Sequence, residues 1–286
     1  MSLALANKIE LLHDRAKMLG KVRSFFQARR VIEVDTPILS KTGCVDPHID
    51  LISANCCGKR CYLHSSPEYA MKRLLGMGIG DCYQLGHVFR DSELGEKHNP
   101  EFTMIEWYRH QFTLDQLIDE TVDLITLFIG DQKVTKISYE QVFYDYLGYF
   151  PETIEKRDRL FADEIEPKLD ALTVLIDYPP EQACLARKVA KQGEMVALRF
   201  EIFFRGIELG NGYDELSNLH ELSERLHSAN EQRLQLGKES YPLDREFLNT
   251  KIPPCCGVAI GFDRLMMLKH HAEHIKDVIP LHFEQL

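Results

Sequence analysis

The sequence FRDSELGEKHNPEF, residues 89–102, decides how the fold is interpreted. Residues 80–89 hold a short run in which apolar and polar side chains alternate, and residues 101–108 hold a second such run. Residues 90–100 are polar and rich in turn-forming residues. The pattern therefore predicts two β-strands joined by a long charged loop.

Helices and strands are predicted in irregular order along the rest of the chain. Apolar residues at helical spacing indicate helices over residues 6–29 and 114–129, and Gly130 ends the second one. Residues 31–37 are expected to form an edge strand closed by a proline, and residues 131–172 a helical insertion. Further strand-like segments lie at residues 173–176, 195–204, 206–211 and 256–262.

This order of segments predicts an α+β fold with a mostly antiparallel β-sheet flanked by helices. The sequence holds no repeat, no low-complexity tract and no Gly/Ser-rich linker. Residues 1–286 are therefore expected to form a single domain.

The composition limits the classes of protein to which the chain can belong. Of its 286 residues 44% are hydrophobic and 27% charged, which is ordinary for a globular protein. Lys and Arg total 34 against 44 Asp and Glu, and a net charge of -10 disfavours a broad nucleic-acid groove. The apolar run at residues 124–129 is too short to cross a bilayer, and residues 1–21 lack the apolar core of a signal peptide. A cytoplasmic protein without a membrane partner is expected.

The cysteines favour a reducing compartment. Eight cysteines are too few for a disulfide scaffold, and two adjacent pairs, at 56–57 and 255–256, suit free thiols. The spacing of Cys57, Cys61 and His64 is compatible with part of a zinc site, but the paired CxxC knuckles are missing. Thiols without a metal are the favoured interpretation.

The loop after the first predicted strand carries groups that suit a nucleotide. Arg90 offers a planar fork of donors for a phosphate, His98 can add positive charge, and Phe102 offers a stacking face. The alternative is a solvated β-hairpin loop without function.

Three carboxylates recur every seven residues at Glu201, Glu208 and Glu215. Aromatic and β-branched neighbours and the glycines of residues 206–212 predict two strands and a turn rather than a helix. Carboxylates on adjacent strands can converge on a hard cation. The alternative is that each glutamate only faces solvent.

Two strand-to-helix or loop-to-helix junctions also carry candidate residues. At residues 256–268 Asp263 fits the helix start, and Arg264 lies near the positive end of the helix dipole, where a triphosphate would bind. An ordinary junction with a surface arginine is the alternative. Pro67 is expected at the first position of another helix, where Glu68 is either functional or only a helix-start carboxylate.

Together these segments resemble the class II aminoacyl-tRNA synthetases, and within them the lysyl-tRNA synthetase catalytic domain. Residues 31–37 match motif 1, residues 89–102 match motif 2 and residues 257–264 match motif 3. Three subfamily signatures extend the match along nearly the whole chain: HNPEFTM at 98–104, RFE at 199–201 and ELGNGYDEL at 208–216.

One departure narrows the resemblance. Lysyl-tRNA synthetases carry an anticodon-reading domain before motif 1, and here only about thirty residues precede that motif, so no anticodon-binding domain is expected. The chain therefore most resembles the family of truncated lysyl-tRNA synthetase paralogues that ligate (R)-β-lysine to a lysine of translation elongation factor P.

The resemblance implies an ATP-dependent amino-acid ligase that forms an aminoacyl-adenylate and yields AMP and diphosphate. ATP and Mg²⁺ are the implied cofactors, and lysine or β-lysine is the implied small-molecule substrate. The implied acceptor is a lysine ε-amine of elongation factor P, with no tRNA. An acidic chain suits a basic acceptor surface. Motif 1 implies a homodimer.

The resemblance also implies residue roles. Arg90 and Arg264 would be catalytic, and Glu201 and Glu208 would hold magnesium. The ATP-binding residues would be Arg90, Asp91, Ser92, His98, Asn99, Phe102, Glu208, Leu209, Gly261 and Arg264. The amino-acid pocket would consist of Ser66, Pro67, Glu68, Tyr108, Glu215 and Ala259.

Two positions depart from the lysyl-tRNA synthetase pattern. Ser92 stands where those enzymes have a glutamate, and Glu93 follows it. Ala259 stands where tRNA-charging relatives have a glycine, and the extra methyl group could discriminate between α- and β-amino acids by about 1 to 3 kcal/mol.

Two other functions remain open. One is a catalytic-core synthetase that charges tRNA with lysine, which the missing anticodon domain disfavours. The other is a non-catalytic regulatory paralogue, which predicts eroded ATP-binding residues. Arg90, Glu201, Glu208 and Arg264 are all present, which disfavours that alternative.

Overall fold

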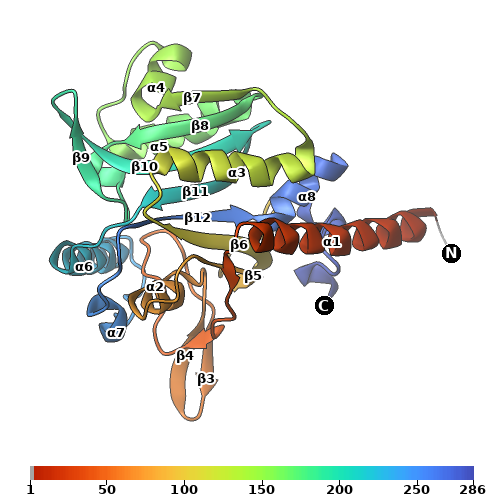
Figure 1. Ribbon diagram of the computed structural model, residues 1–286, viewed down its shortest axis with the longest axis horizontal. Helices are drawn as coiled ribbons and strands as arrows, with labels where there is room; N and C mark the ends of the chain where they lie inside the picture. Colours follow the sequence, from red (N-terminus) through yellow and green to blue (C-terminus); the bar gives the residue numbers. More distant parts are fainter. Residues whose placement is uncertain (1–2) are drawn as a thin grey trace. The chain divides into compact units, whose positions relative to one another are not determined.

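The computed structural model describes residues 3–286, with side chains from residue 7 onward, and the chain divides into two compact units (Figure 1). Unit 1 comprises the chain up to residue 110 together with residues 217–254 and 261–286. Unit 2 comprises residues 111–216 and 255–260. That both units act as one catalytic domain stays a prediction.

Unit 1 combines a long N-terminal helix with three paired strands and a separate three-stranded sheet. β1 lies parallel to β5, β5 and β6 are antiparallel, and β2, β4 and β3 form a separate three-stranded sheet. The helices are α1 (Leu3–Ala28), α2 (Glu68–Gly76), α6 (Leu219–Gln235), α7 (Arg245–Leu248) and α8 (Phe262–His270). The strands are β1 (Ile32–Glu33), β2 (Leu39–Ser40), β3 (Ser53–Cys56), β4 (Lys59–Leu63), β5 (Cys82–Phe89) and β6 (Glu101–His110).

The β5–β6 pair confirms the two strands and charged loop predicted from residues 80–108. Phe89 pairs with Glu101 at the loop end of the ladder, so residues 90–100 form the connection. The strand expected over 31–37 is shorter than predicted and covers only Ile32–Glu33. The reason is that the Thr36 N–H donates to the Gln84 side chain instead of to a strand, and proline 37 has no N–H to donate.

Helix α1 packs on one face of β5 and β6, and the candidate site residues of β6 lie on the opposite face. The Phe26 ring stacks on Tyr83 with centroids 4.1 Å apart and meets Trp107 edge-on at 5.3 Å. Because side chains alternate along a strand, Trp107 and Thr103 share the covered face, and Phe102, Glu106 and Tyr108 share the other.

Unit 2 is a mostly antiparallel sheet with helices packed on it. Its strands run in the order β12, β11, β10, β8, β7, with β9 paired to β10, and only β7 and β8 are parallel. The strands are β7 (Val134–Ser138), β8 (Leu172–Tyr178), β9 (Lys188–Lys191), β10 (Glu194–Phe204), β11 (Ile207–Asp214) and β12 (Cys255–Gly261). The helices are α3 (Leu114–Ile129), α4 (Tyr139–Leu147) and α5 (Ile154–Leu160).

Local sequence accounts for two of these elements. The Thr113 hydroxyl accepts the Gln116 N–H while the Gln116 side chain accepts the Thr113 N–H, so α3 begins at the predicted residue and ends before Gly130. Arg205 and Gly206 both have positive φ, at 52° and 65°, and form the tight two-residue turn between β10 and β11. The predicted pair of strands around the glycines is thereby confirmed.

The segment at 131–172 is not wholly helical, contrary to the prediction. It begins with β7, which extends the sheet by pairing with β8, and only then continues into α4, α5 and a π-helical turn, Phe161–Ile165. Aromatic side chains of this segment, including Phe143 and Phe161, build a core against Phe203 of β10. Residues 134–138 carry no clear strand pattern, and only their pairing with β8 shows the strand.

Over residues 3–286, none of the helices combines the length and the apolar character needed to cross a membrane.

Candidate active site

Arg90 directly follows β5 and is held for contact with an anion. Its backbone N–H donates to the Pro100 carbonyl at 2.9 Å, and its guanidinium lies 5.1 Å from the Phe102 ring centroid. Its Nε is buried and has no hydrogen-bond partner among the described residues. A buried donor without a partner is costly, so this atom is suited to receive a ligand oxygen.

In the loop after Arg90, Ser92 occupies the position at which lysyl-tRNA synthetases have a glutamate. Ser92 has a φ of 61°, and its N–H donates to Asp91 Oδ1 at 2.8 Å. The carboxylate that contacts Arg90 belongs to the next residue, Glu93, at 3.7 Å.

His98 and Arg264, which lie far apart in the sequence, are brought together. The Arg264 Nη2 lies 2.8 Å from His98 Nε2. Because arginine can only donate, the histidine nitrogen accepts in this contact. Two residues predicted to bind the phosphates therefore lie in direct contact.

Gly261 precedes α8 as its N-cap residue. The nearest described atom that a Cβ at this position would meet is Arg264 Cδ, at 3.6 Å. Packing within the described chain therefore does not require a glycine here. An approaching nucleotide would use the space, at a helix N-terminus that favours negative charge.

Asn99 is fastened to the chain by both ends of its amide. The Nδ2 donates to the Glu101 carbonyl at 2.6 Å, and the Oδ1 accepts the Phe283 N–H at 3.2 Å. These bonds fix the loop end before β6. Direct contact of Asn99 with adenosine stays a prediction.

Asp263 ties the nucleotide-side elements of unit 1 together, a role beyond the predicted helix start. It is 1% exposed, accepts from Arg15 Nη1 at 2.5 Å and accepts the Thr103 N–H at 2.7 Å. Arg15 also donates to the Thr103 hydroxyl at 2.8 Å. Helices α1 and α8 are thereby locked to β6, next to Arg264.

Glu106 forms the centre of the amino-acid side of unit 1. It is 3% exposed, accepts from Ser66 Oγ at 2.6 Å and accepts from Tyr108 OH at 2.7 Å. Burial, assisted by the nearby charge of Glu68, raises the pKa of Glu106 to about 7. Two predicted pocket residues thus hold a carboxylate that the sequence analysis did not name.

Sequence reasoning missed Glu106 because the second strand was interpreted as alternating between core and solvent. The structure buries both faces over residues 103–109. A glutamate between Ile105 and Trp107 in a run that is buried on both sides is the signal that could have identified it.

α2 begins at Glu68, and Pro67 is its N-cap residue rather than, as had been predicted, its first helical residue. The Glu68 carboxylate accepts from Lys72 Nζ at 2.6 Å, and Lys72 is almost completely buried. Glu68 therefore already has a cationic partner within the chain.

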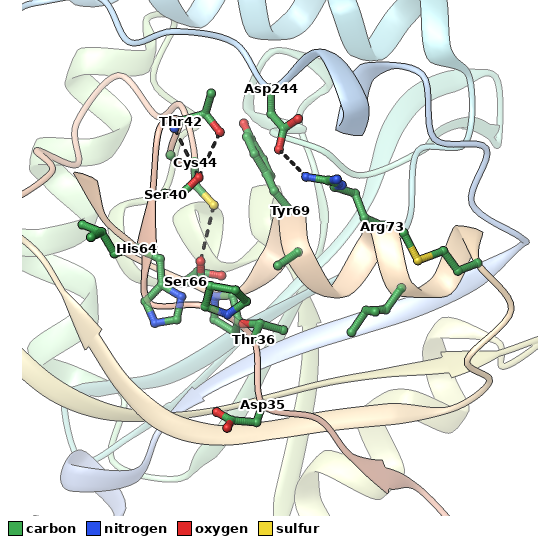
Figure 2. A pocket seen from close by; sticks show the side chains of 17 residues that line it. Asp35, Thr36, Ser40, Thr42, Cys44, His64, Ser66, Tyr69, Arg73 and Asp244 are labelled. Carbon is green, nitrogen blue, oxygen red and sulfur yellow. Dashed lines mark hydrogen bonds and ion pairs between the residues drawn. The ribbon is translucent and has the colours of Figure 1, made fainter. Parts of the chain in front are cut away.

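A cavity of about 380 Å³ borders the segment that carries Ser66 and Pro67 (Figure 2). The Cys44 thiol lies in its wall and donates to the Ser66 carbonyl at 3.6 Å. The Thr36 hydroxyl, also in the wall, is buried without a hydrogen-bond partner in the described chain. The cavity therefore lies directly beside the segment that is predicted to contact the amino acid.

In unit 2, Glu201 and Glu208 lie on the adjacent strands β10 and β11. Glu201 is ion-paired with Arg199, whose guanidinium lies 4.6 Å from the Tyr178 ring centroid. Burial raises the pKa of Glu201, Arg199 opposes that shift, and the charge of Glu208 adds to it. The two carboxylates are thus close enough to repel one another.

This donor set fits a magnesium ion that is shared with phosphates. Among residues 3–286 no three His, Cys, Asp or Glu side chains gather into a metal site of their own. Magnesium characteristically takes one or two carboxylates and completes its shell with water and substrate phosphates. Two mutually repelling carboxylates meet that requirement.

The other predicted residues of unit 2 flank these strands. The Leu209 side chain is buried, so a predicted ligand contact at this residue would be made by its backbone. Glu215 is 3% exposed and donates its N–H to the Cys255 carbonyl at 3.0 Å. Ala259 pairs with Asn211 across β12 and β11. Their ligand roles stay predictions.

The possible zinc ligands do not come together. The His64 Nε2 lies 2.8 Å from the His87 carbonyl, and the Cys61 thiol donates to the Lys59 carbonyl at 3.8 Å. Cys57 is exposed at the turn of the β3–β4 hairpin.

Comparison with known proteins places the chain in a family. The model of the tRNA synthetases of class II (D, K and N) matches residues 2–284. The chain belongs to the class II tRNA synthetase family. The predicted family, the α+β class and the mostly antiparallel sheet are confirmed.

Curated relatives align with this chain over nearly its full length and theirs. The elongation factor P–(R)-β-lysine ligases of Avibacterium paragallinarum and Pasteurella multocida (strain Pm70) are each 36% identical, and the alignments cover 96% of this chain and 96% of each relative. The ligase of the same name from Vibrio parahaemolyticus serotype O3:K6 is 37% identical, with 96% of both chains covered.

Proposed function

We propose that this family member is an ATP-dependent ligase that adenylates (R)-β-lysine and transfers it to the ε-amine of a specific lysine of translation elongation factor P. The observation that carries the proposal is the pairing of an anion-binding set, Arg90 with Arg264, and a buried carboxylate centre at Glu106 in one unit. The relatives at 36–37% identity, named for this reaction, support the choice of substrate and acceptor.

The nucleotide side binds ATP by charge and stacking. Arg90 and Arg264 hold the phosphates, Phe102 stacks on the base, and the backbone at Gly261 lets the nucleotide approach α8. In unit 2, Glu201 and Glu208 would hold Mg²⁺, which supplies charge neutralisation in phosphoryl chemistry.

The first step is formation of the aminoacyl-adenylate. The substrate carboxylate attacks the α-phosphorus, the bond to the β-phosphate oxygen breaks, and diphosphate leaves. Arg90 stabilises negative charge on the phosphoryl oxygens, which requires no covalent enzyme nucleophile.

The second step joins the amino acid to the acceptor. The ε-amine of the acceptor lysine attacks the acyl carbon, an amide bond forms and AMP leaves. Ala259 stands where tRNA-charging relatives have glycine, and its methyl group would favour a β-amino over an α-amino acid.

The proposed enzyme is a cytoplasmic homodimer. Large apolar side chains are exposed at Ile32 in the motif 1 segment, at Ile38 and Leu39 directly after it, and at Met77 after α2. Exposed apolar side chains of this kind are typical of an interface between subunits.

Mass spectrometry of the acceptor tests this proposal. Purified elongation factor P is incubated with the protein, ATP, Mg²⁺ and either (R)-β-lysine or α-lysine. We expect the factor to gain the mass of one lysyl group, faster with the β-isomer. An unmodified factor, or lysyl transfer to tRNA instead, would contradict the proposal.

A further inference from the structure

The turn of the β3–β4 hairpin carries two adjacent cysteines that none of the predicted roles uses. Cys57 and Gly58 occupy the two turn positions with φ of 53° and 71°, and Cys56 pairs with Lys59 at the ends of the two strands. A positive φ at both central residues is characteristic of the type I′ turn, the usual connection of a two-residue hairpin. The turn therefore places both cysteines at the end of the hairpin.

The same turn brings the two sulfur atoms together. The Sγ atoms of Cys56 and Cys57 lie 3.8 Å apart, which is hydrogen-bonding distance for sulfur. Adjacent side chains of an extended strand point to opposite faces, so this contact depends on the turn. Both residues are free thiols, Cys57 exposed and Cys56 partly exposed. A small solute can therefore reach two thiols that already touch.

The two sulfur atoms differ in reactivity. The contact with Cys57 raises the pKa of Cys56, with smaller contributions from desolvation and from the nearby Cys61, so Cys56 keeps its proton. Cys57 is the more exposed of the two, and exposure favours attack on a solute. Cys57 is therefore the sulfur that meets an oxidant first, and Cys56 is the thiol that reacts with the product.

A third thiol, that of Cys61, is poorly placed to compete. Cys61 is 7% exposed, and its thiol donates to the Lys59 carbonyl at 3.8 Å. It pairs with Ala54, which makes it a diagonal neighbour of Cys56. Diagonal neighbours lie about 7–8 Å apart, whereas the Cα atoms of a disulfide usually lie about 4.4–6.8 Å apart. Cys57 is therefore the partner of Cys56.

We propose that Cys56 and Cys57 form a peroxide-sensitive dithiol that closes reversibly to a disulfide. The Cys57 thiolate attacks an oxygen of hydrogen peroxide, the O–O bond breaks, hydroxide leaves and Cys57 becomes a sulfenic acid. The Cys56 sulfur then attacks the Cys57 sulfur, the S–O bond breaks, and the hydroxyl group leaves with the Cys56 proton as water. The two thiols lose two electrons and two protons, and the peroxide is reduced to two water molecules. The inference goes beyond the proposed function and does not depend on it.

The backbone makes this disulfide easy to reduce. Cα atoms of adjacent residues are about 3.8 Å apart, closer than the usual lower limit of about 4.4 Å for a disulfide, so the closed form is strained. Strained disulfides have higher reduction potentials and are the labile or regulatory ones. In a reducing compartment the pair therefore returns to thiols once the oxidant is gone.

Peptide mass spectrometry of the full chain tests the inference. The protein is treated with hydrogen peroxide, quenched with catalase, alkylated with iodoacetamide and digested with trypsin, which cleaves after Lys59 and so separates the pair from Cys61. A second cleavage, before Asp50, removes Cys44 from the same peptide. We expect peptide 50–59 to lose the mass of two hydrogen atoms and both alkylation sites, and to regain both sites after dithiothreitol.

Single substitutions separate the two sulfur atoms. Cys56→Ser leaves Cys57 without the second thiol, so its sulfenic acid should persist and be trapped by dimedone, which should not label the hairpin of the unsubstituted protein. Cys57→Ser should keep Cys56 open to alkylation after the same peroxide treatment. Cys61→Ser should close the pair as the unsubstituted protein does. The matched control is Cys184→Ser, which removes an exposed thiol of unit 2 and should leave closure unchanged.

Two results would overturn the inference. One is a peptide 50–59 that keeps both alkylation sites at a peroxide concentration that oxidises glutathione in the same sample. The other is a disulfide that joins Cys56 to Cys61 or joins two chains. ATP–diphosphate exchange measured in parallel keeps the two proposals apart, since Cys57→Ser should exchange at the rate of the unsubstituted protein. If the unsubstituted protein shows no exchange, the proposed function fails and the thiol result stands.

Discussion

Glu106 in unit 1 and Glu201 in unit 2 are the same side chain in two different settings. Burial raises the pKa of both. Glu106 is held by two neutral hydroxyls, whereas Glu201 is ion-paired with Arg199. A guanidinium stabilises the charged form of Glu201, and hydroxyl groups stabilise that of Glu106 far less.

The difference shows that the hydrogen-bonding or ionic partner of a buried carboxylate, rather than its burial, decides which ligand it suits. Glu106 titrates at about pH 7 and gains most from an incoming ammonium, which supplies the missing positive charge. Glu201 already has its cation and feels a second carboxylate, Glu208, so it suits an ion shared with phosphates. We therefore assign amino-acid selection to Glu106 and the metal to Glu201.

The largest effect should come from Arg90, for which we propose a role in nucleotide binding whichever carboxylate selects the amino acid. Arg90→Ala should lower amino-acid-dependent ATP–diphosphate exchange by at least about 100-fold, because it removes charge stabilisation at the phosphoryl oxygens. The melting temperature should stay near that of the unsubstituted protein. The matched control is Arg60→Ala, which removes an exposed arginine of β4 that is ion-paired with Glu239. Near-normal exchange in Arg90→Ala would contradict the assignment of the phosphate site.

Asp263 extends the comparison to a third buried carboxylate, one that is fully paired and structural. Asp263→Asn leaves Arg15 buried without its anion and should lower the free energy of unfolding by about 3 to 5 kcal/mol. Urea denaturation followed by circular dichroism measures it. Glu239→Gln, which removes an exposed partner of Arg60, should change stability little. Equal losses of unfolding free energy in the two variants would show that the Arg15–Asp263 ion pair contributes no more to stability than an exposed pair.

The pH dependence of stability sharpens the contrast further. Because the pKa of Glu106 is raised from 4.5 to about 7, its contribution to stability without ligands is full below about pH 4.5 and is lost as pH rises through about 7. Glu106→Gln lacks this dependence, so relative to the unsubstituted protein it should become more stable between pH 5 and pH 8. Urea denaturation at several pH values measures the difference. A difference that is constant with pH would contradict the titration of Glu106.

Local patterns were enough to predict much of the fold. The limits of α3 follow from Thr113 and Gly130, and the β10–β11 turn follows from its glycines, since both signals act within a few residues. Strand β7 was missed because five residues with little burial cannot be told from a loop without the partner strand β8.

The candidate site was predicted less completely, because its key contacts are distant in sequence. Arg15 and Asp263 lie 248 positions apart, and nothing local indicates that they pair. Glu106 was hidden because only tertiary packing shows that both faces of β6 are buried. Arg90, His98 and Arg264 could be named as candidates because their residue types and neighbours suit anion binding even before the fold is known.

Steady-state ATP–diphosphate exchange with Glu106→Gln and Glu201→Gln tests the central claim most directly. The account predicts that Glu106→Gln raises the KM for the amino acid about 30-fold or more, as loss of a charged hydrogen bond requires, and leaves the Mg²⁺ requirement unchanged. Glu201→Gln should raise the Mg²⁺ concentration needed for half-maximal rate and leave the KM for the amino acid unchanged. If both substitutions change the same parameter, the assignment of separate roles to the two carboxylates is wrong.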